Sequence, residues 1–323
     1  MKKINRNELI IKPLRNRQHD LDLRVVKNLE NRCVQSGDAL AKVAVDLFEA
    51  KKAGRSRILF MGGHVVRAGV QRYIIDLMER GYISCLAMNG SCIIHDFEFA
   101  LVGATTESVA HYISEGQFGL WKETGQINDI VNNAFAANNS VGLGASVGEF
   151  ILKGNFPFKD ISLLAAASRL GIPATVHVGI GYDIIHEHPN FDGAATGALS
   201  YNDFLILAAV VSDLEGGVVM SFGSAVMAPE VYLKALSMAR NVAFQEKREI
   251  CHFTNLVCDL AQLPEDITVE PAKNEHFYYF RPLKTMLIRT VADGGKSFYV
   301  RGNHAETIPA LWSHTNVLES QNA

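Results

Sequence analysis

Five short apolar runs constrain the fold of this chain more than any other feature. They lie near residues 57–62, 83–88, 174–178, 217–222 and 297–300, and each is followed within two residues by a glycine. These runs are rich in aliphatic and β-branched residues and show little alternation, which is typical of strands buried on both faces of a sheet. Segments with helical periodicity separate them. The sequence therefore predicts an α/β fold with a mainly parallel, Rossmann-like sheet and helices on both faces.

The chain shows neither an internal repeat nor a linker rich in Pro or Ser. We therefore expect a single domain over residues 1–323, with an irregular N-terminal segment (about 1–36) and a short C-terminal tail (about 317–323). Helices are expected near 37–54, 65–80, 91–102, 126–138, 141–154, 159–171, 200–217 and 229–241, and over the terminal segment HAETIPALWSH.

Composition narrows the classes of partner. The chain has 31 Lys and Arg residues against 34 Asp and Glu, a net charge of −3, so no nucleic-acid partner is expected. The N-terminus lacks a signal-peptide core and we find no apolar run of membrane-spanning length, which predicts a cytoplasmic protein without a membrane partner. The five cysteines form no Cys-x-x-Cys pair, so reduced thiols are expected.

Four glycine-containing turns are expected at the carboxyl ends of strands, where open parallel sheets bind ligands. Each offers a tight turn and small or amide-bearing side chains, and none matches the G-x-G-x-x-G fingerprint. The turns are Gly62-Gly63-His64, Asn89-Gly90-Ser91, Phe222-Gly223-Ser224 and Arg301-Gly302-Asn303-His304. They are either ordinary strand-to-helix connections or, taken together, the walls of a nucleotide-type crevice.

Four segments that include these turns resemble deoxyhypusine synthase, an NAD-binding α/β family. The segments are ILFMGGHVVRAGVQRYIIDLMERGYISCLAMNGSCIIHDFEFAL, HVGIGYDIIHEH, EGGVVMSFGSAVMAPEVYLKALSMARN and SFYVRGNHAETIPALWSHTN. The resemblance covers residues 57–316 in patches. It implies NAD as cofactor, a small polyamine-type amine as substrate, transferase or oxidoreductase chemistry and a homotetramer, with the aromatic segment 277–281 partly buried between subunits.

The same resemblance assigns roles to individual positions of this chain. Cofactor contacts fall on Gly63, His64, Asn89, Gly90, Ser91, Gly223, Ser224 and Asn303. An acidic position of the family falls near His95 and Asp96, and its substrate-amine aspartate resembles Asp183. The family's imine-forming lysine, in a Trp-Gly-Lys segment, is absent here, and Lys284 and Lys296 are weak substitutes.

The segment GYDIIHEHPNFDG, residues 181–193, holds the densest group of acid, base and ligand side chains in the chain. His186 and His188, with Asp192 or Asp183, could bind a metal if the segment is extended. The same side chains could instead bind an ammonium substrate and exchange protons near neutral pH, or form a solvated loop.

Three functions remain open at this point. The first is an enzyme that binds NAD or a related nucleotide and acts on a small amine, with Asp183, His188 and His95 as catalytic residues and no metal. The second is a metal-dependent hydrolase that uses His186, His188 and Asp192. The third is a ligand-binding protein of the same fold without catalysis.

Overall fold

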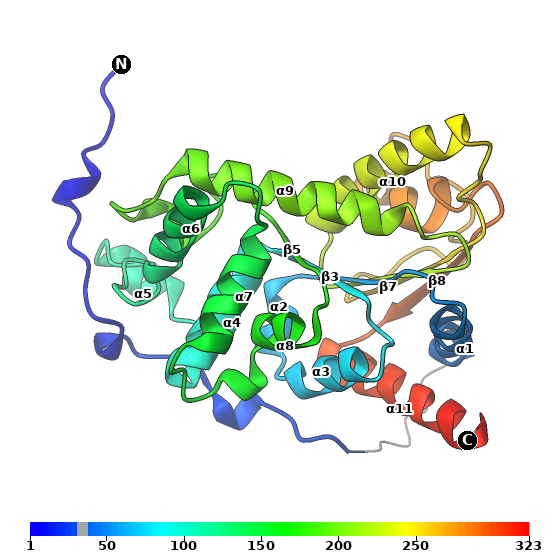
Figure 1. Cartoon of the computed structure of the whole chain (residues 1–323), viewed down its shortest axis with the longest axis horizontal. Coiled ribbons are helices and arrows are strands. Elements are labelled where there is room, and N and C mark those ends of the chain that lie inside the picture. Colours follow the sequence, from blue (N-terminus) through cyan, green and yellow to red (C-terminus); the bar gives the residue numbers. More distant parts are fainter. Residues whose placement is uncertain (31–37, 323) are drawn as a thin grey trace.

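The computed structural model describes residues 1–30 and 38–322, and in it helices cover both faces of one six-stranded parallel sheet (Figure 1). The strand order is β5-β3-β2-β6-β7-β8, and every neighbouring pair is parallel. The strands are β2 (Arg57–Met61), β3 (Cys85–Asn89), β5 (Ala174–His177), β6 (Val218–Phe222), β7 (Thr254–Asp259) and β8 (Lys296–Arg301). The predicted α/β class is confirmed. The five expected strands are present, and β7 is a sixth strand of the same sheet.

Alternating side chains of each strand enter two separate cores. In β2, Leu59 and Met61 pack into one core, whereas Ile58 and Phe60 pack into the other. The first core lies under α1 (Asp38–Lys52), α2 (Gly63–Arg67), α3 (Gln71–Glu79), α4 (Gly90–Val102), α6 (Gln126–Ala137), α7 (Leu143–Lys153), α8 (Leu163–Leu170) and α11 (His304–Asn322). The second lies under α9 (Gly193–Val211), α10 (Met227–Gln245) and a π-helical segment, Pro282–Arg289. Both faces of the strands are buried, which explains their lack of polar alternation.

The strand order reverses between β2 and β6. The chain starts at the centre with β2, moves outward to β3 and β5, and then returns to the other side of β2 for β6, β7 and β8. The helices that follow β2 and β6 therefore lie on opposite faces of the sheet, and the turns that precede them meet at its carboxyl edge.

The expected helix over 65–80 is broken into α2 and α3 around Gly69. Gly69 has φ of +73°, and a Cβ there would lie 1.8 Å from the carbonyl oxygen of Val25. The N–H of Lys27 also donates to the Gly69 carbonyl at 2.8 Å. The N-terminal segment thus packs directly onto this turn, a contact that helical periodicity does not reveal.

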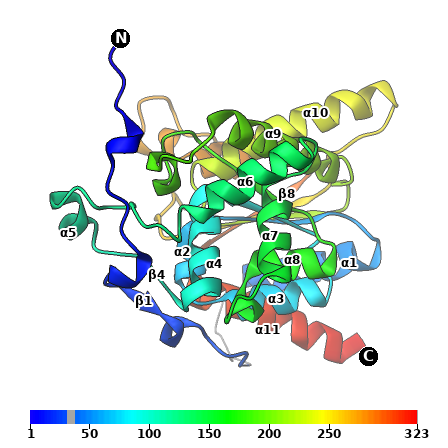
Figure 2. The ribbon, with the colours of Figure 1, turned by 60° about the vertical axis from the view of Figure 1, so that its left-hand side comes forward.

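Residues 1–30, which we call the N-terminal strap, run along the molecule (Figure 2). Its strand β1 (Leu21–Asp22) pairs with β4 (Ala104–Thr105), and the Arg6 guanidinium donates to the carbonyl of Phe191 at 2.8 Å. At the other terminus, the expected tail from about residue 317 is the last part of α11.

The sequence predicted that no apolar run is long enough to span a membrane, but α9 is long and apolar enough to do so by length and composition alone. This is weak evidence for a membrane span, because core helices share the same properties. The helix carries buried Asp203, whose carboxylate accepts the N–H groups of Gly144 and Val176 at 2.9 and 2.8 Å. Asp203 thereby joins α9 to α7 and β5 within the fold.

Among the described cysteines, Cys85, Cys92 and Cys258 are buried and Cys251 is partly buried, all as free thiols. Cys33 lies outside the described residues.

Candidate functional site

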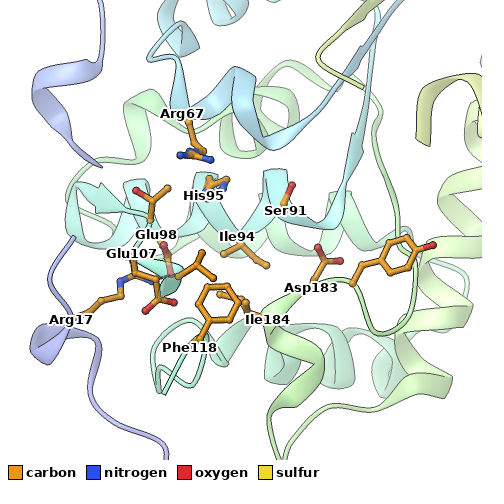
Figure 3. Close-up of a pocket in the computed structure, with 13 residues that line it drawn as sticks. Arg17, Arg67, Ser91, Ile94, His95, Glu98, Glu107, Phe118, Asp183 and Ile184 are labelled. Atoms are coloured by element: carbon orange, nitrogen blue, oxygen red, sulfur yellow. Dashed lines mark hydrogen bonds and ion pairs between the residues drawn. The ribbon is translucent and has the colours of Figure 1, made fainter. Parts of the chain in front are cut away.

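Two cavities open where the strands end, and Arg67 lines both of them. The first, which we call the strand-end cavity, has a volume of about 460 Å³. It is lined by Leu21, His64, Arg67, Ala68, Gly223, Asp259, Leu260, Asn303 and His304. The second, the α4 cavity, has a volume of about 250 Å³ (Figure 3). It is lined by Arg17, Arg67, Ser91, Ile94, His95, Glu98, Thr106, Glu107, Val109, Phe118, Tyr182, Asp183 and Ile184.

The glycine pair after β2 lets three segments meet between these cavities. A Cβ on Gly62 would lie 2.1 Å from the carbonyl oxygen of Gly223, at the end of β6. A Cβ on Gly63 would lie 2.5 Å from the Ser91 hydroxyl and 3.1 Å from the His95 ring, both on α4. Any side chain at either glycine would therefore push apart the turns that form the crevice.

The strand-end cavity brings together turns that are far apart in the sequence. His64, Gly223 and Asn303, which follow β2, β6 and β8, all line it. Gly223 has φ of +61°, and a Cβ there would lie 2.6 Å from Nε2 of His304. Burial lowers the pKa of His304, and its Nδ1 has no hydrogen-bond partner among the described residues.

Several of the expected cofactor residues also shape the local backbone. Asn89 caps α4 by accepting the Cys92 N–H at 3.3 Å, and Asn303 accepts the Ala305 N–H at 2.9 Å. The Ser224 hydroxyl accepts the Ala228 N–H at 3.1 Å and is not part of either cavity lining. These contacts are the ordinary capping roles of Ser and Asn.

In the α4 cavity, His95 is held by a chain of buried polar contacts. Its Nδ1 lies 2.8 Å from the Thr105 hydroxyl, which donates to Glu98 at 2.6 Å. The Glu98 carboxylate also accepts two hydrogen bonds from Arg17, at 2.9 and 2.7 Å. Burial lowers the pKa of His95 to about 4, so that its ring is neutral near pH 7.

Asp183 faces the α4 cavity from the loop after β5. A Cβ on Gly90 would lie 2.0 Å from its carboxylate, so Gly90 is needed for this approach. Burial raises the pKa of Asp183 to about 6. Nδ1 of His186 accepts the N–H groups of Gly181 and Asp183, at 3.0 and 3.1 Å, and fixes the loop that carries the carboxylate.

His188 lies apart from both cavities. Its Nε2 is 2.9 Å from the carbonyl oxygen of Gly119, and its ring fills the space that a Cβ on Gly125 would need. Asp192 caps α9 through the N–H groups of Ala194 and Ala195. Residues Ile184–Glu187 form a 3-10 turn, so the two histidines are not arranged as on an extended segment. Within residues 1–30 and 38–322, we find no group of three acid, His or Cys side chains placed to hold a metal ion.

The two lysines considered as imine formers lie elsewhere. Lys284 is buried with its ammonium 3.5 Å from the centre of the Tyr278 ring, and Lys296 pairs with Asp46 at 3.0 Å. Neither residue lines a cavity described above.

Sequence reasoning missed four groups that shape the site: Arg67, Asp259, Glu98 and Thr105. Asp259 is the last residue of β7 and Arg67 lies one turn after His64, so the strand-end pattern itself could have identified both. Glu98 lies on the same helix as His95, but its importance depends on the distant residue Arg17. Thr105 carries no local signal at all.

Comparison with known proteins supports the fold. No family model matches the chain, and no curated protein matches it in sequence. The solved structure of unliganded AgrE matches 88% of this chain and 34% of its own, with a TM-score of 0.52 and 15% identity. AgrE in a ternary complex with ornithine and NAD+ matches 87% of this chain and 33% of its own, with a TM-score of 0.51 and 13% identity.

A protein of Entamoeba histolytica assigned as a deoxyhypusine synthase also matches, over 87% of this chain and 88% of its own. The TM-score is 0.47 and the identity is 9%. The present chain spans about a third of the length of AgrE, and the likeness concerns the fold alone. The described residues thus share a Rossmann-like fold with part of a protein that binds NAD+.

Proposed function

We propose that this protein is an NAD-binding enzyme that oxidises a small amine or amino acid. The observation that carries the proposal is the pair of cavities that meet at Arg67, beside the point where the strand order reverses. Dinucleotides bind across this point in open parallel sheets. We propose that the strand-end cavity holds a nucleoside half of NAD+. The titratable groups of the α4 cavity would then lie around the nicotinamide half and the substrate.

The residues of the strand-end cavity fit a nucleoside and its phosphates. Asp259 offers carboxylate oxygens to the hydroxyl groups of a ribose, and Asn303 and His304 line the same cavity. Arg67, at the junction, has a buried Nε without a hydrogen-bond partner among the described residues. An anionic pyrophosphate bound between the cavities would pair with the guanidinium charge of Arg67.

The residues of the α4 cavity fit a small amine. Asp183 supplies a carboxylate for the ammonium group, while Phe118 and Ile94 supply apolar walls. Bound NAD+ supplies a hydride acceptor. Among the described residues, no lysine lines either cavity, so we propose oxidation and not transfer through a lysine imine. The ternary structure of AgrE with ornithine and NAD+ supports this choice of substrate class.

Calorimetry and thermal shift with NAD+, NADP+ and FAD test the cofactor. We expect NAD+ to bind and stabilise the protein, and Arg67→Met to weaken binding by about tenfold or more, because an arginine–phosphate contact is lost. Arg72→Met is the matched control, since Arg72 is exposed on α3. If millimolar NAD+ neither binds to the wild-type protein nor stabilises it, the proposal is wrong.

Turnover is then sought by following NADH fluorescence with L-ornithine, L-lysine, L-arginine and simple primary amines. NAD+ binding without any turnover would favour the non-catalytic alternative.

A further inference from the structure

We infer that the α4 cavity receives its substrate as a primary ammonium ion and that Nε2 of His95 removes one of its protons. Thr105 and Glu98 act as positioning residues that hold the hydrogen of the neutral ring on Nδ1, so that the lone pair lies on Nε2. The inference rests on the proposed function and deepens it, because it selects amines over alcohols and names the proton acceptor.

Glu98 is the fixed end of the polar chain. Both its side chain and that of Arg17 are 1% exposed, and they form a two-pronged ion pair. Two hydroxyl groups, of Thr105 and Thr124, each donate to the carboxylate at 2.6 Å. Burial alone would raise the pKa of Glu98, but Arg17 and the hydroxyl donors outweigh it and the pKa lies below its usual value. Glu98 is therefore ionised and can only accept hydrogen bonds.

This charge dictates the tautomer of His95. The single hydroxyl hydrogen of Thr105 is directed at Glu98, so the Thr105 oxygen must accept a hydrogen from Nδ1 of His95 at 2.8 Å. A neutral imidazole with its hydrogen on Nδ1 has a lone pair on Nε2. The ring lines the α4 cavity, so we place this lone pair toward it (Figure 3).

Charged neighbours keep the ring neutral as well. Burial is the main cause of its low pKa, and Arg67, Arg17 and His64 lower it further, while Glu98 opposes them. Binding an anion at Arg67 would remove part of this effect. Cofactor binding would thus make His95 a better proton acceptor than it is in the empty protein.

Two further acceptors line the α4 cavity together with His95. Ser91 is one helical turn before it on α4, and its hydroxyl hydrogen is donated to Asn89 at 2.9 Å. The Ser91 oxygen therefore offers only lone pairs to the cavity, and the Asp183 carboxylate likewise only accepts once it is ionised. Three acceptors match the three N–H donors of an ammonium group. An alcohol has one donor and would leave two acceptors unsatisfied.

One proton then moves from the substrate to His95. The ammonium group R–NH3+ gives one proton to Nε2, which leaves R–NH2 with a free electron pair on nitrogen and His95 as an imidazolium. Thr105 continues to accept from Nδ1, and ionised Glu98 stabilises the new positive charge through it. Asp183 remains ionised and keeps the amine in place.

Nitrogen-15 NMR of the histidine side chains tests the tautomer without any turnover. Spectra are recorded for the wild type, Thr105→Val and Thr105→Ser, and the His95 signals are assigned by their loss in His95→Gln. We expect the wild type and Thr105→Ser to carry hydrogen on Nδ1 and to show an unprotonated Nε2. Thr105→Val should shift toward the Nε2–H form. A wild-type ring with its hydrogen on Nε2 overturns the inference, and this holds even if Thr105→Val fails to fold.

The same signal tests the ligand class, with n-butylammonium and n-butanol as probes and NAD+ present. We expect n-butylammonium to bind at least about tenfold more tightly and to move the Nε2 signal toward that of a protonated nitrogen. Equal responses to both probes, or none to either, overturn the selectivity. Binding of NAD+ is measured separately by calorimetry, so a protein that shows the expected tautomer but no NAD+ binding refutes the proposed function and not the tautomer.

Discussion

The strand-end cavity and the α4 cavity share Arg67 but are built in different ways. The strand-end cavity consists mainly of residues that directly follow β2, β6, β7 and β8, so sheet topology alone brings them together. The α4 cavity combines α4 and Arg67 of α2 with three segments outside the sheet, around Arg17, Thr106–Phe118 and Tyr182–Ile184, the second of which contains α5 (Val109–Ser114). A parallel sheet therefore provides a binding edge by default, whereas the α4 cavity depends on segments outside the sheet that only tertiary contacts bring together.

The two cavities also differ in their electrostatics. In the strand-end cavity, Asp259 and Asn303 are accessible and suited to holding polar groups of a ligand. In the α4 cavity, burial shifts the pKa of Asp183 up to about 6 and that of His95 down to about 4. Such opposed shifts in one enclosed space are typical of sites that move protons. We therefore expect mutations to separate binding from chemistry.

The largest expected effect is on turnover. Asp183→Asn should reduce kcat/KM by about 10³-fold, equivalent to about 4 kcal/mol, because the neutral amide cannot form the buried charge pair with an ammonium ion. The dissociation constant of NAD+ should change by less than about twofold, since Asp183 does not line the strand-end cavity. Steady-state kinetics and calorimetry measure the two quantities.

Asp192→Asn is the matched control for this variant. Asp192 lies nine residues away and only caps α9, and asparagine caps a helix equally well. If both variants lose turnover to the same extent, or if Asp183→Asn loses NAD+ binding, the division of labour between the cavities is wrong.

The sequence predicted the strand-end cavity better than the α4 cavity for a physical reason. Strand ends of a parallel sheet meet at one edge, so the positions of His64, Gly223 and Asn303 in the sequence were enough to bring them together. Thr105 and Arg17 lie in segments without periodicity, and only tertiary contacts place them beside His95. His188 is the opposite case. It belongs to a dense polar motif and was predicted as a catalytic residue, but its ring packs against Gly119 and Gly125.

A second test concerns stability. Arg17→Met should lower the free energy of unfolding by about 3 kcal/mol, because it leaves the Glu98 carboxylate buried without its cation. Arg15→Met, on the exposed side of the same segment, should change it by less than about 0.5 kcal/mol. Urea denaturation gives both values. Equal stability of the two variants would show that the N-terminal strap is not a structural part of the α4 cavity.

A third test concerns the strand-end cavity alone. Asp259→Asn should weaken NAD+ binding by about tenfold, because a hydrogen bond from a ribose hydroxyl to a charged acceptor becomes one to a neutral acceptor. The stability of the apoprotein should change little. Glu306→Gln, which removes the same charge from the exposed first turn of α11, is the control. Calorimetry gives the dissociation constant of NAD+ for both variants. Equal losses of affinity would indicate a general charge effect and not a ribose contact.

The smallest expected effect is the response of the wild type to pH, and it distinguishes the two cavities within one protein. Burial raises the pKa of Asp183 to about 6, so about half of the carboxylate is ionised at pH 6 and about one tenth at pH 5. Because only the ionised carboxylate pairs with an ammonium ion, kcat/KM for an amine should fall about fivefold between pH 6 and pH 5. His95 has a pKa of about 4 in the empty protein and is mostly neutral there over this interval. The affinity for NAD+ should not fall in parallel, since Asp183 is remote from the strand-end cavity. A kcat/KM that stays constant down to pH 5 would mean that Asp183 does not bind the substrate in its charged form.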